Sequence, residues 1–107
     1  MYGYAGRILY VDLNTGKTRV EKLSEDYAKK YIGGIGLGMK LWLDNSKAGV
    51  EPFSPENTLV LALGPISGTI FPTAGNGHAF VAKSPETFGI GESLAHGTFG
   101  AEMKRAG

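Results

Sequence analysis

The side chains that most often carry chemistry are scarce in this chain. Its 107 residues include no cysteine and two histidines, His78 and His96. Without cysteine the chain offers no disulfide, no thiolate nucleophile and no thiolate ligand for zinc or an iron–sulfur cluster. Two histidines do not complete a metal site without carboxylates at a useful spacing, and the sequence shows no such spacing. We therefore expect no catalytic centre built from this chain's side chains alone.

The two histidines stand in different local contexts. His78 lies in an apolar run, where we expect a half-buried strand residue. His96 stands between Ala95 and Gly97, just before a short helical pattern. The N-terminus of a helix presents free backbone N–H groups, so His96 and its neighbours could meet an anion there. An ordinary loop position is the other interpretation of His96, and the sequence leaves both open.

Two glycine patterns resemble known motifs but fail their requirements. The run GGIGLG at 33–38 lacks the third glycine of a dinucleotide fingerprint, because Met39 stands there. It also lies inside a helical pattern and does not follow a strand. The segment 91–95 approaches the nucleophile turn of hydrolases, yet Ala95 occupies the position of its last glycine. Close packing of a helix is the alternative explanation for 33–38.

The segment 61–107 is the most informative part of the chain. It holds nine of the 17 glycines, together with two short apolar runs. Glycine accepts positive φ and lets a ligand approach the main chain. The apolar runs are too hydrophobic for a disordered linker. We interpret this segment as a shaped surface that holds a large polar group against exposed backbone.

Residues 7–45 predict a hairpin followed by a helix. Alternating side chains over 7–23 surround the sequence Asn-Thr-Gly-Lys, in which Gly16 suits the left-handed position of a short bulged loop. Ser24 is a good N-cap, and apolar residues recur at helical spacing up to Leu43. At the glycines at 33–38 either the helix breaks or another backbone packs closely against it. Because the apolar spacing continues across these glycines, we favour one long helix with close packing or a mild kink there.

The remaining elements complete an α+β fold. A polar loop at 45–57 precedes a predicted strand at 58–63, and a second strand is predicted at 77–83. A loop at 86–91 leads to a short helix that starts at Leu94 or Gly97, ends at Arg105 and has Gly107 as its C-cap. The prediction is a single domain over 1–107, with an antiparallel-rich β-sheet, one long helix and one short helix.

Composition excludes some classes of partner. Lys and Arg number 11 against 10 Asp and Glu, which gives a formal net charge of +1. A nucleic-acid-binding surface needs a basic patch or stripe, and we expect none. No stretch approaches the roughly 20 apolar residues of a membrane span. The N-terminus does not read as a signal peptide, so the expected location is the cytoplasm.

Taken in order, a set of short motifs resembles one family. The set comprises Met1-Tyr2-Gly3, Gly6-Arg7, the hairpin 11–16, Pro55-Glu56-Asn57, Gly64-Pro65, Ser67-Gly68-Thr69, Pro72-Thr73, Lys83-Ser84-Pro85, the run 99–102 and Ala106-Gly107. These motifs are similar to the start of the tungsten-containing aldehyde ferredoxin oxidoreductases. The similarity spans nearly the whole chain, with almost unchanged spacing.

The resemblance implies a role in cofactor binding. In this family the N-terminal domain forms a β-rich base for a tungsten (or molybdenum) bis-pterin cofactor, whose phosphates are bridged by magnesium. The reaction oxidises an aldehyde to a carboxylic acid and passes electrons to ferredoxin. Cysteines that bind the iron–sulfur cluster, and proton-transfer residues, lie in later domains. The resemblance therefore implies that this chain binds no iron–sulfur cluster, is not catalytic alone and has the remaining domains or subunits as partners.

The family's cofactor contacts carry over to two segments. One is an Arg soon after the Pro-Thr pair, and the other is a backbone segment before the Phe-Gly-Ala-Glu helix. The resemblance thus implies these cofactor-binding residues: Gly75, Asn76, Gly77, Leu94, Ala95, His96 and Gly97. The chain departs from the family in having Asn76 or Gly77 where the Arg stands, and the planar guanidinium contact has no substitute in Asn.

The missing Arg keeps two alternatives open. The first is a non-catalytic binding or assembly protein that kept the fold without the cofactor, and the second is an oligomeric scaffold. The chain also matches only the first of two similar halves of the family's N-terminal domain. A missing half would leave a strand edge and apolar surface exposed. We therefore expect the chain to form a homodimer, in which a second copy stands in for the absent half.

Overall fold

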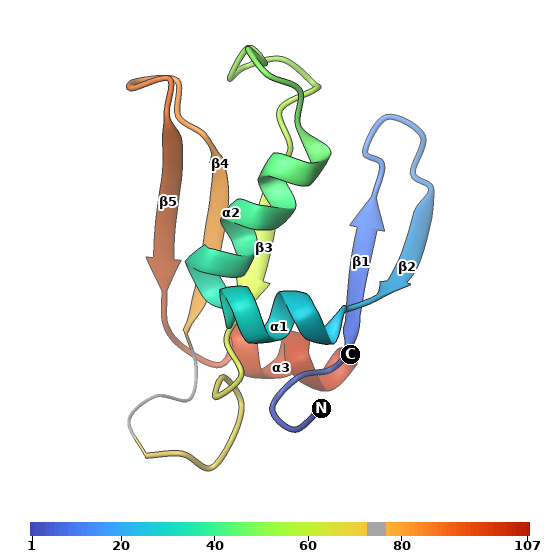
Figure 1. Cartoon of the computed structure of the whole chain (residues 1–107), viewed down its shortest axis with the longest axis vertical. Coiled ribbons are helices and arrows are strands. Elements are labelled where there is room, and N and C mark those ends of the chain that lie inside the picture. Colours follow the sequence, from blue (N-terminus) through green and yellow to red (C-terminus); the bar gives the residue numbers. More distant parts are fainter. Residues whose placement is uncertain (73–76) are drawn as a thin grey trace.

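The protein folds into two antiparallel sheets and three helices (Figure 1). The structure, a computed structural model, describes residues 1–72 and 77–107. Along the chain the elements are β1 (Arg7–Val11), β2 (Thr18–Lys22), α1 (Glu25–Tyr31), α2 (Gly34–Asn45), β3 (Val60–Leu63), β4 (His78–Lys83), β5 (Ile90–Ala95) and α3 (Phe99–Ala106). The strands β1 and β2 form one sheet, and β3, β4 and β5 form the other in that order. The predicted α+β class is confirmed.

The predicted hairpin is confirmed as β1 and β2. Arg7 pairs with Lys22 at its base and Val11 with Thr18 at its tip. Gly16 has φ +72°, which is the left-handed conformation that its place in the loop requires. In Figure 1 the hairpin stands beside the rest of the molecule, and the C-terminal end of α3 lies near its base.

The prediction of one long helix is wrong, because the helix ends and restarts at Ile32 and Gly33. Ser24 caps α1 as expected, its hydroxyl accepting a hydrogen bond from the Asp26 N–H at 3.2 Å. Ile32 then takes φ 63°, and α2 begins at Gly34 in a new direction. A side chain at Gly33 would lie 2.7 Å from the Leu63 carbonyl oxygen, so this turn depends on close contact with the strand end.

Close packing of the helical glycines is confirmed at Gly36 and Gly38. A Cβ at Gly36 would lie 2.7 Å from the Tyr31 carbonyl oxygen. The helix α2 lies across β3 and β4, where Gly38 faces the fully buried side chain of Val81. A Cβ at Gly38 would lie 2.8 Å from Val81 Cγ2, which is closer than packed carbon atoms approach. The helix α2 also contributes Leu37 and Leu41 to a cluster of buried residues that includes Leu23 and Ala28.

We predict that Gly38→Ala lowers the free energy of unfolding by about 1 to 3 kcal/mol, because the added methyl overpacks a rigid core. The same change in a Val81→Ala background removes the clash. There it should be neutral or stabilising by up to about 1 kcal/mol, since Ala is the better helix former. Urea unfolding of the wild type, Gly38→Ala, Val81→Ala and the double variant measures this double-mutant cycle. An equal effect of Gly38→Ala in both backgrounds would contradict the predicted clash with Val81.

The three-stranded sheet contains one strand that the sequence analysis missed. β4 was predicted and is confirmed, with Val60 of β3 opposite Val81. On its other edge β4 pairs with β5, so His78 lies opposite Ala95 and Lys83 opposite Ile90. The predicted helix start at Leu94 is therefore wrong, because Leu94 and Ala95 belong to a strand. The helix α3 begins at Phe99, two residues after the alternative start, and Gly107 is its C-cap as expected.

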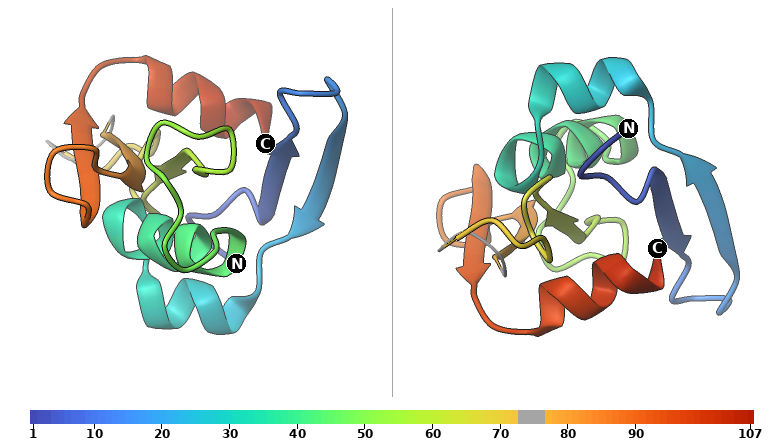
Figure 2. Two further views of the ribbon diagram at one scale, coloured as in Figure 1. Left: turned by 90° about the horizontal axis from the view of Figure 1, so that it is seen from above. Right: turned by 90° about the horizontal axis from the view of Figure 1, so that it is seen from below.

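The helices α2 and α3 lie on opposite sides of the three-stranded sheet. Both views in Figure 2 show this arrangement, with the hairpin beyond the β3 edge of the sheet. The loop between α2 and β3 is fixed by Asn57, whose side-chain amide donates to the Pro52 and Lys83 carbonyl oxygens. No helix in residues 1–72 and 77–107 has the length and apolar character needed to cross a membrane.

Candidate functional site

The predicted cofactor-contacting segments lie side by side at one end of the three-stranded sheet. Gly77 directly precedes β4, and Leu94 and Ala95 close β5. The strand register places Ala79 opposite Leu94 and His78 opposite Ala95. Through this pairing β4 and β5 bring together two segments that are well separated in the sequence. We call this lower end of the sheet in Figure 1 the platform end, comprising residues 77–79 and 94–99.

The individual platform residues are mostly accessible. Leu94 is 57% exposed, and His96 and Gly97 are also exposed. The His96 ring lies beside Gly77, since a Cβ at Gly77 would lie 3.4 Å from His96 Nε2. The predicted contacts at Gly75 and Asn76 lie outside the described residues. The structure thus brings together Gly77 and the segment 94–97, and leaves their backbone reachable from solvent.

The N-terminus of α3 opens onto the same place. Thr98 is its N-cap residue, but its φ and ψ are helical and no side chain of the described residues caps the helix. The first N–H groups of a helix have no partner within the helix and carry a partial positive charge. Gly97 has φ +135°, and a Cβ there would meet nothing within 4 Å. Bare backbone donors and free space therefore coincide at this turn.

A buried clamp holds the platform end in place. The Ser67 hydroxyl, in a buried residue, donates to the Gly77 carbonyl oxygen at 2.8 Å and accepts from the Gly64 N–H at 3.3 Å. From α3, Lys104 Nζ donates to the Gly64 and Pro65 carbonyl oxygens at 2.9 Å each. Desolvation by burial lowers the pKa of Lys104 from its usual 10.5. These contacts connect the loop after β3, the start of β4 and α3.

This clamp was not predicted from the sequence. Ser67 belongs to one of the motifs used for the resemblance, but no role followed from its type. Lys104 could not be paired with its acceptor from the sequence, because Gly64 lies 40 residues away. The one available signal was Gly68, which has φ +72° and packs so closely on α3 that a Cβ there would lie 3.2 Å from Ala101 Cα.

His78 has a packing role at the base of the platform end. It is 8% exposed in β4, so it is more buried than the half-buried strand residue that was predicted. Its ring centroid lies 5.1 Å from that of Phe99 and 5.7 Å from that of Phe80. Its Nδ1 has no hydrogen-bond partner in the described part of the chain. His78 therefore joins the sheet to the first residue of α3.

Residues 1–72 and 77–107 contain no group of three or more His, Cys, Asp or Glu side chains placed to hold a metal ion. What the platform end offers is backbone N–H groups, one exposed imidazole and open space. Such a surface is suited to bind an anionic group, such as a phosphate, and not to coordinate a metal directly.

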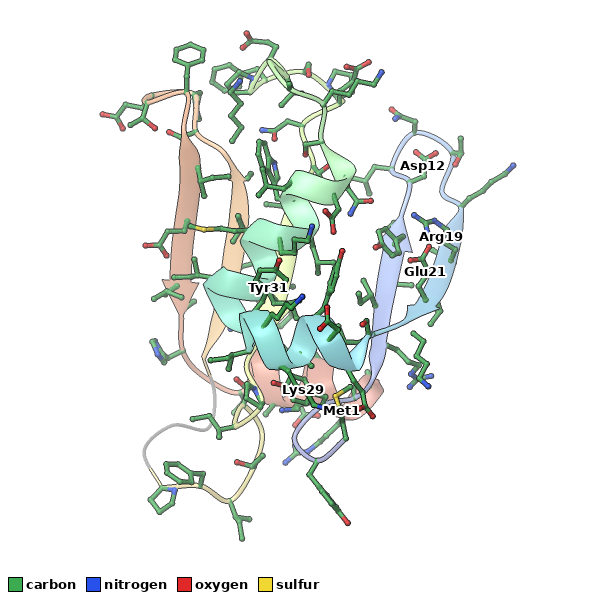
Figure 3. All side chains as sticks on the ribbon, in the orientation of Figure 1. Met1, Asp12, Arg19, Glu21, Lys29 and Tyr31 are labelled. Carbon is green, nitrogen blue, oxygen red and sulfur yellow. The ribbon has the colours of Figure 1, made fainter. Side chains whose placement is uncertain are left out.

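A polar cleft of about 370 Å³, separate from the platform end, lies between the hairpin and the helices. It is lined in part by Tyr10, Arg19, Tyr27 and Asp44. Its main charges are already paired within the chain. Arg19 stacks on Tyr10 and pairs with Glu21, and Figure 3 shows both charged residues on the hairpin. On the opposite wall Asp44 accepts hydrogen bonds from Lys40 Nζ at 2.6 Å and from the Tyr27 hydroxyl at 2.7 Å. We interpret this cleft as a structural polar network.

This network predicts an acid-sensitive contribution to stability. The hydrogen bond from Lys40, and then that from Tyr27, lower the pKa of Asp44 below its usual 3.8. A carboxyl with a depressed folded-state pKa stabilises the fold above the unfolded pKa, and the contribution is lost as pH falls through the folded value. Between about pH 7 and pH 3 the wild type should therefore lose more thermal stability than Asp44→Asn. Parallel Tm curves for the two proteins would contradict this.

Comparison with known proteins identifies the family. A family model described as the N-terminal domain of aldehyde ferredoxin oxidoreductase matches residues 8–107. The chain belongs to this family. It is 46% identical over 107 residues to the tungsten-containing aldehyde ferredoxin oxidoreductase of Pyrococcus furiosus, and 43% identical to that of Pyrococcus horikoshii. The resemblance inferred from the sequence motifs is confirmed.

Other relatives in the aldehyde ferredoxin oxidoreductase family carry different names. The WOR-like subunit of an aliphatic sulfonate oxidoreductase of Pyrococcus furiosus is 41% identical over 110 residues. Among solved structures, the active-site complex BamBC of benzoyl coenzyme A reductase with 1,5-dienoyl-CoA superimposes with a TM-score of 0.90 at 36% identity, covering 99% of this chain. The same fold thus occurs in proteins whose names state different substrates.

The match covers only a small part of each aldehyde ferredoxin oxidoreductase relative. The chain spans 18% of the Pyrococcus furiosus and Pyrococcus horikoshii proteins and 16% of the chain in the benzoyl coenzyme A reductase structure. More than four-fifths of each relative therefore lies outside the matched region. The full-length relatives therefore contain other domains besides the matched region.

Proposed function

We propose that this chain forms part of the binding platform for a tungsten (or molybdenum) bis-pterin cofactor in an aldehyde ferredoxin oxidoreductase-like enzyme. One observation carries the proposal: Gly77 and the segment 94–97, both implied by the family resemblance to contact the cofactor, are adjacent across β4 and β5 at the start of α3, where no side chain of the described residues caps the helix. The names of the relatives support tungsten as the metal.

The platform residues can bind an anionic group through their backbone N–H groups, without a charged side chain. The open space beside Gly97 admits a phosphate to the first N–H groups of α3, where the helix dipole favours negative charge. The exposed His96 imidazole can donate a further hydrogen bond. The clamp of Ser67 and Lys104 holds these donors in position before any ligand binds. Preorganised donors of this kind bind without a cost for ordering the chain.

In the full enzyme this platform would serve the oxidation of an aldehyde to a carboxylic acid, with electrons passed to ferredoxin. When bound, the cofactor would supply the redox chemistry, and Gly77, the segment 94–97 and the first N–H groups of α3 would hold its phosphates together with magnesium. The chain itself provides position and electrostatics, and it contributes no thiolate to an iron–sulfur cluster, since it contains no cysteine. We therefore propose that the isolated chain has no catalytic activity.

Metal analysis tests this function. The chain is produced as part of a complete enzyme, for example fused to the remaining four-fifths of the Pyrococcus furiosus protein, in cells supplied with tungstate or molybdate. The proposal expects tungsten or molybdenum and pterin in a fixed ratio to protein. Folded, complete enzyme without metal and without pterin would contradict it.

A homodimer is the proposed state of the 107-residue chain when it is produced alone. Among the described residues, sixteen large hydrophobic side chains are exposed, whereas nine hydrophobic residues are buried. Exposed apolar surface on this scale favours association. Light scattering at micromolar concentration should give twice the 11.3 kDa mass of one chain. A monomer under these conditions would exclude the dimer.

A non-catalytic binding or assembly protein, or an oligomeric scaffold, is the second candidate function. It is favoured by one feature, the absence of Arg between Pro72 and His78, where the family resemblance implies a guanidinium contact. Asn76→Arg in the complete enzyme separates the candidates. If the platform binds the cofactor, the variant should retain at least as much metal as the parent, whereas a scaffold should contain none in either form.

A further inference from the structure

The platform end carries its titratable side chains on two histidines. Residues 64–82 and 94–99, which hold the platform end and the loop before it, contain no Asp, Glu, Lys, Arg, Tyr or Cys. The histidines in these ranges are His78 and His96. His78 is buried, with its ring centroid 5.1 Å from that of Phe99, whereas His96 is exposed. His96 is therefore the side chain placed to bring positive charge to an anion at this surface.

The His96 ring occupies the place into which a side chain at position 77 would project. A Cβ at Gly77 would lie 3.4 Å from His96 Nε2 and 3.5 Å from His96 Cδ2. The backbone of His96 follows β5 directly and leads through Gly97, around which there is open space, into the start of α3. One imidazole thus lies where β4 begins, β5 ends and the first N–H groups of α3 are reachable.

The other charges near His96 are paired or distant. In the first turn of α3, Glu102 pairs with Arg105, and Lys104 donates to carbonyl oxygens of the loop after β3. On β5, Glu92 lies three residues before the end of the strand, roughly 10 Å from it, where salt screens most of an exposed charge. His96 itself takes part in no ion pair within residues 1–72 and 77–107. The charge of its imidazole is therefore available to a ligand.

The buried histidine is a second, independent sign of a polar ligand at this turn. On β4, His78 lies opposite Ala95, the residue before His96, and its ring packs on the first residue of α3. It is only 8% exposed, and its Nδ1 has no hydrogen-bond partner in the described part of the chain. Buried polar atoms are nearly always paired, so an unpaired one calls for an explanation such as an ion or a water. A polar group bound at this turn supplies that explanation.

We propose that His96 is the charged side-chain contact of the platform end, where its imidazolium binds the same anionic group as the first N–H groups of α3. The proposal deepens the proposed function, on which it rests, by naming the side chain that supplies positive charge. A charged imidazole beside the positive end of α3 is unfavourable alone, and an anion between the two relieves the repulsion. Hydrogen bonds from charged donors are about twice as strong as neutral ones. Histidine changes its charge between about pH 5 and 8, so anion binding should depend on pH.

Sulfate tests the proposal, because its double negative charge is constant over this range and it brings neither metal nor pterin. The 107-residue chain is titrated with sulfate at fixed ionic strength, and binding is followed by NMR on the His96 ring and the backbone N–H groups of 97–99. We expect an affinity about tenfold higher at about pH 5.5 than at about pH 8.

Three variants separate charge from hydrogen bonding. His96→Gln keeps an N–H donor without the charge, so its affinity should stay at the wild type's value for about pH 8 under both conditions. His96→Lys is charged under both conditions and should bind with the higher affinity in each. Lys17→Gln is the matched control, because it removes one positive charge from the exposed hairpin loop, away from the platform end.

The proposal is overturned if His96→Gln keeps the pH dependence of the wild type, or if Lys17→Gln loses as much affinity as His96→Gln. Absence of sulfate binding at about pH 5.5, by a chain whose NMR spectrum shows that it is folded, would also overturn it. If the chain does not fold alone, sulfate binding by the same variants is measured by equilibrium dialysis on the complete enzyme.

The position of the ring beside Gly77 provides a charge swap in the complete enzyme. Gly77 does not have a left-handed φ, so it accepts a side chain once the imidazole is removed. His96→Gly should lower the pterin content per folded protein about tenfold, and Gly77→Arg in the same protein should restore it, because the guanidinium enters from the opposite strand. A double variant with no more pterin than His96→Gly would contradict the proposal.

The swap also separates this proposal from the proposed function. Unchanged pterin content in His96→Gly, in a parent that holds pterin, would overturn the role of His96 and leave the cofactor platform intact. A folded parent without pterin would overturn the platform function, and the sulfate titration would then decide alone whether His96 binds an anion.

Discussion

Replacing Gly97 with valine should remove the cofactor from the complete enzyme while leaving the fold intact. Gly97 has φ +135°, a conformation that L residues with a side chain rarely adopt, and valine is among the most restricted. The link between β5 and α3 must then change course, which redirects the first N–H groups of α3. The residue is exposed and touches no core side chain, so the loss of stability should stay near about 1 to 3 kcal/mol.

The measurement is metal and pterin content per folded protein, for which we expect at least a tenfold loss, equivalent to about 1.4 kcal/mol of binding. Gly16→Val is the matched control. Gly16 also has a left-handed φ, of +72°, and open space around it, but it lies in the hairpin loop away from the platform end. It should cost comparable stability and retain the metal. Unchanged metal content in Gly97→Val would show that Gly97 is not part of the cofactor site.

Asn57→Ala should be the most damaging single truncation outside the hydrophobic core. Its side-chain oxygen accepts hydrogen bonds from Trp42 Nε1 and the Lys83 N–H, both at 3.2 Å. Its amide nitrogen donates to the Pro52 and Lys83 carbonyl oxygens. Alanine leaves these half-buried groups without their partner, so the free energy of unfolding should fall by about 2 to 3 kcal/mol.

Asn14→Ala provides the comparison for Asn57→Ala, because Asn14 lies in the exposed hairpin loop. A surface change of this kind should stay within about 0.5 kcal/mol of the wild type. Urea unfolding with constant m values measures both variants. If Asn57→Ala costs no more than Asn14→Ala, the four hydrogen bonds do not stabilise the loop between α2 and β3.

The parts of the fold that sequence could predict depend on local signals. The hairpin follows from alternating side chains on either side of an Asn-Thr-Gly loop, and each of these signals acts within a few residues. Ser24 as N-cap and Gly107 as C-cap are equally local, and both are found as expected. The strand β4 was recognisable because a run of mostly apolar residues ends at a Ser-Pro pair.

The break between α1 and α2 was missed because two signals conflicted. The apolar spacing continued from Tyr31 to Met39 and favoured one helix. Lys29 and Lys30 followed by glycines at 33 and 34 were a helix C-terminal signal, which the structure shows to be the stronger one. The deciding contact is tertiary, since the backbone at position 33 packs against the Leu63 carbonyl oxygen.

The platform end was only partly predictable, because its geometry depends on β5. This strand carries Gly91, Glu92 and Ser93 at an exposed edge, where polar and glycine residues look like a loop. Without β5 there was no reason from the residues alone to place Gly77 beside His96. The family resemblance pointed to both segments, and the β4–β5 register gives the physical reason why they meet.

A structure of the complete, metal-loaded enzyme tests whether bare backbone donors at the platform end hold the cofactor's phosphates. We predict that backbone N–H groups at the start of α3, with Gly77 and the segment 94–97 around them, lie within hydrogen-bond distance of the pterin phosphates. A loaded enzyme in which these residues face away from the cofactor would contradict the claim.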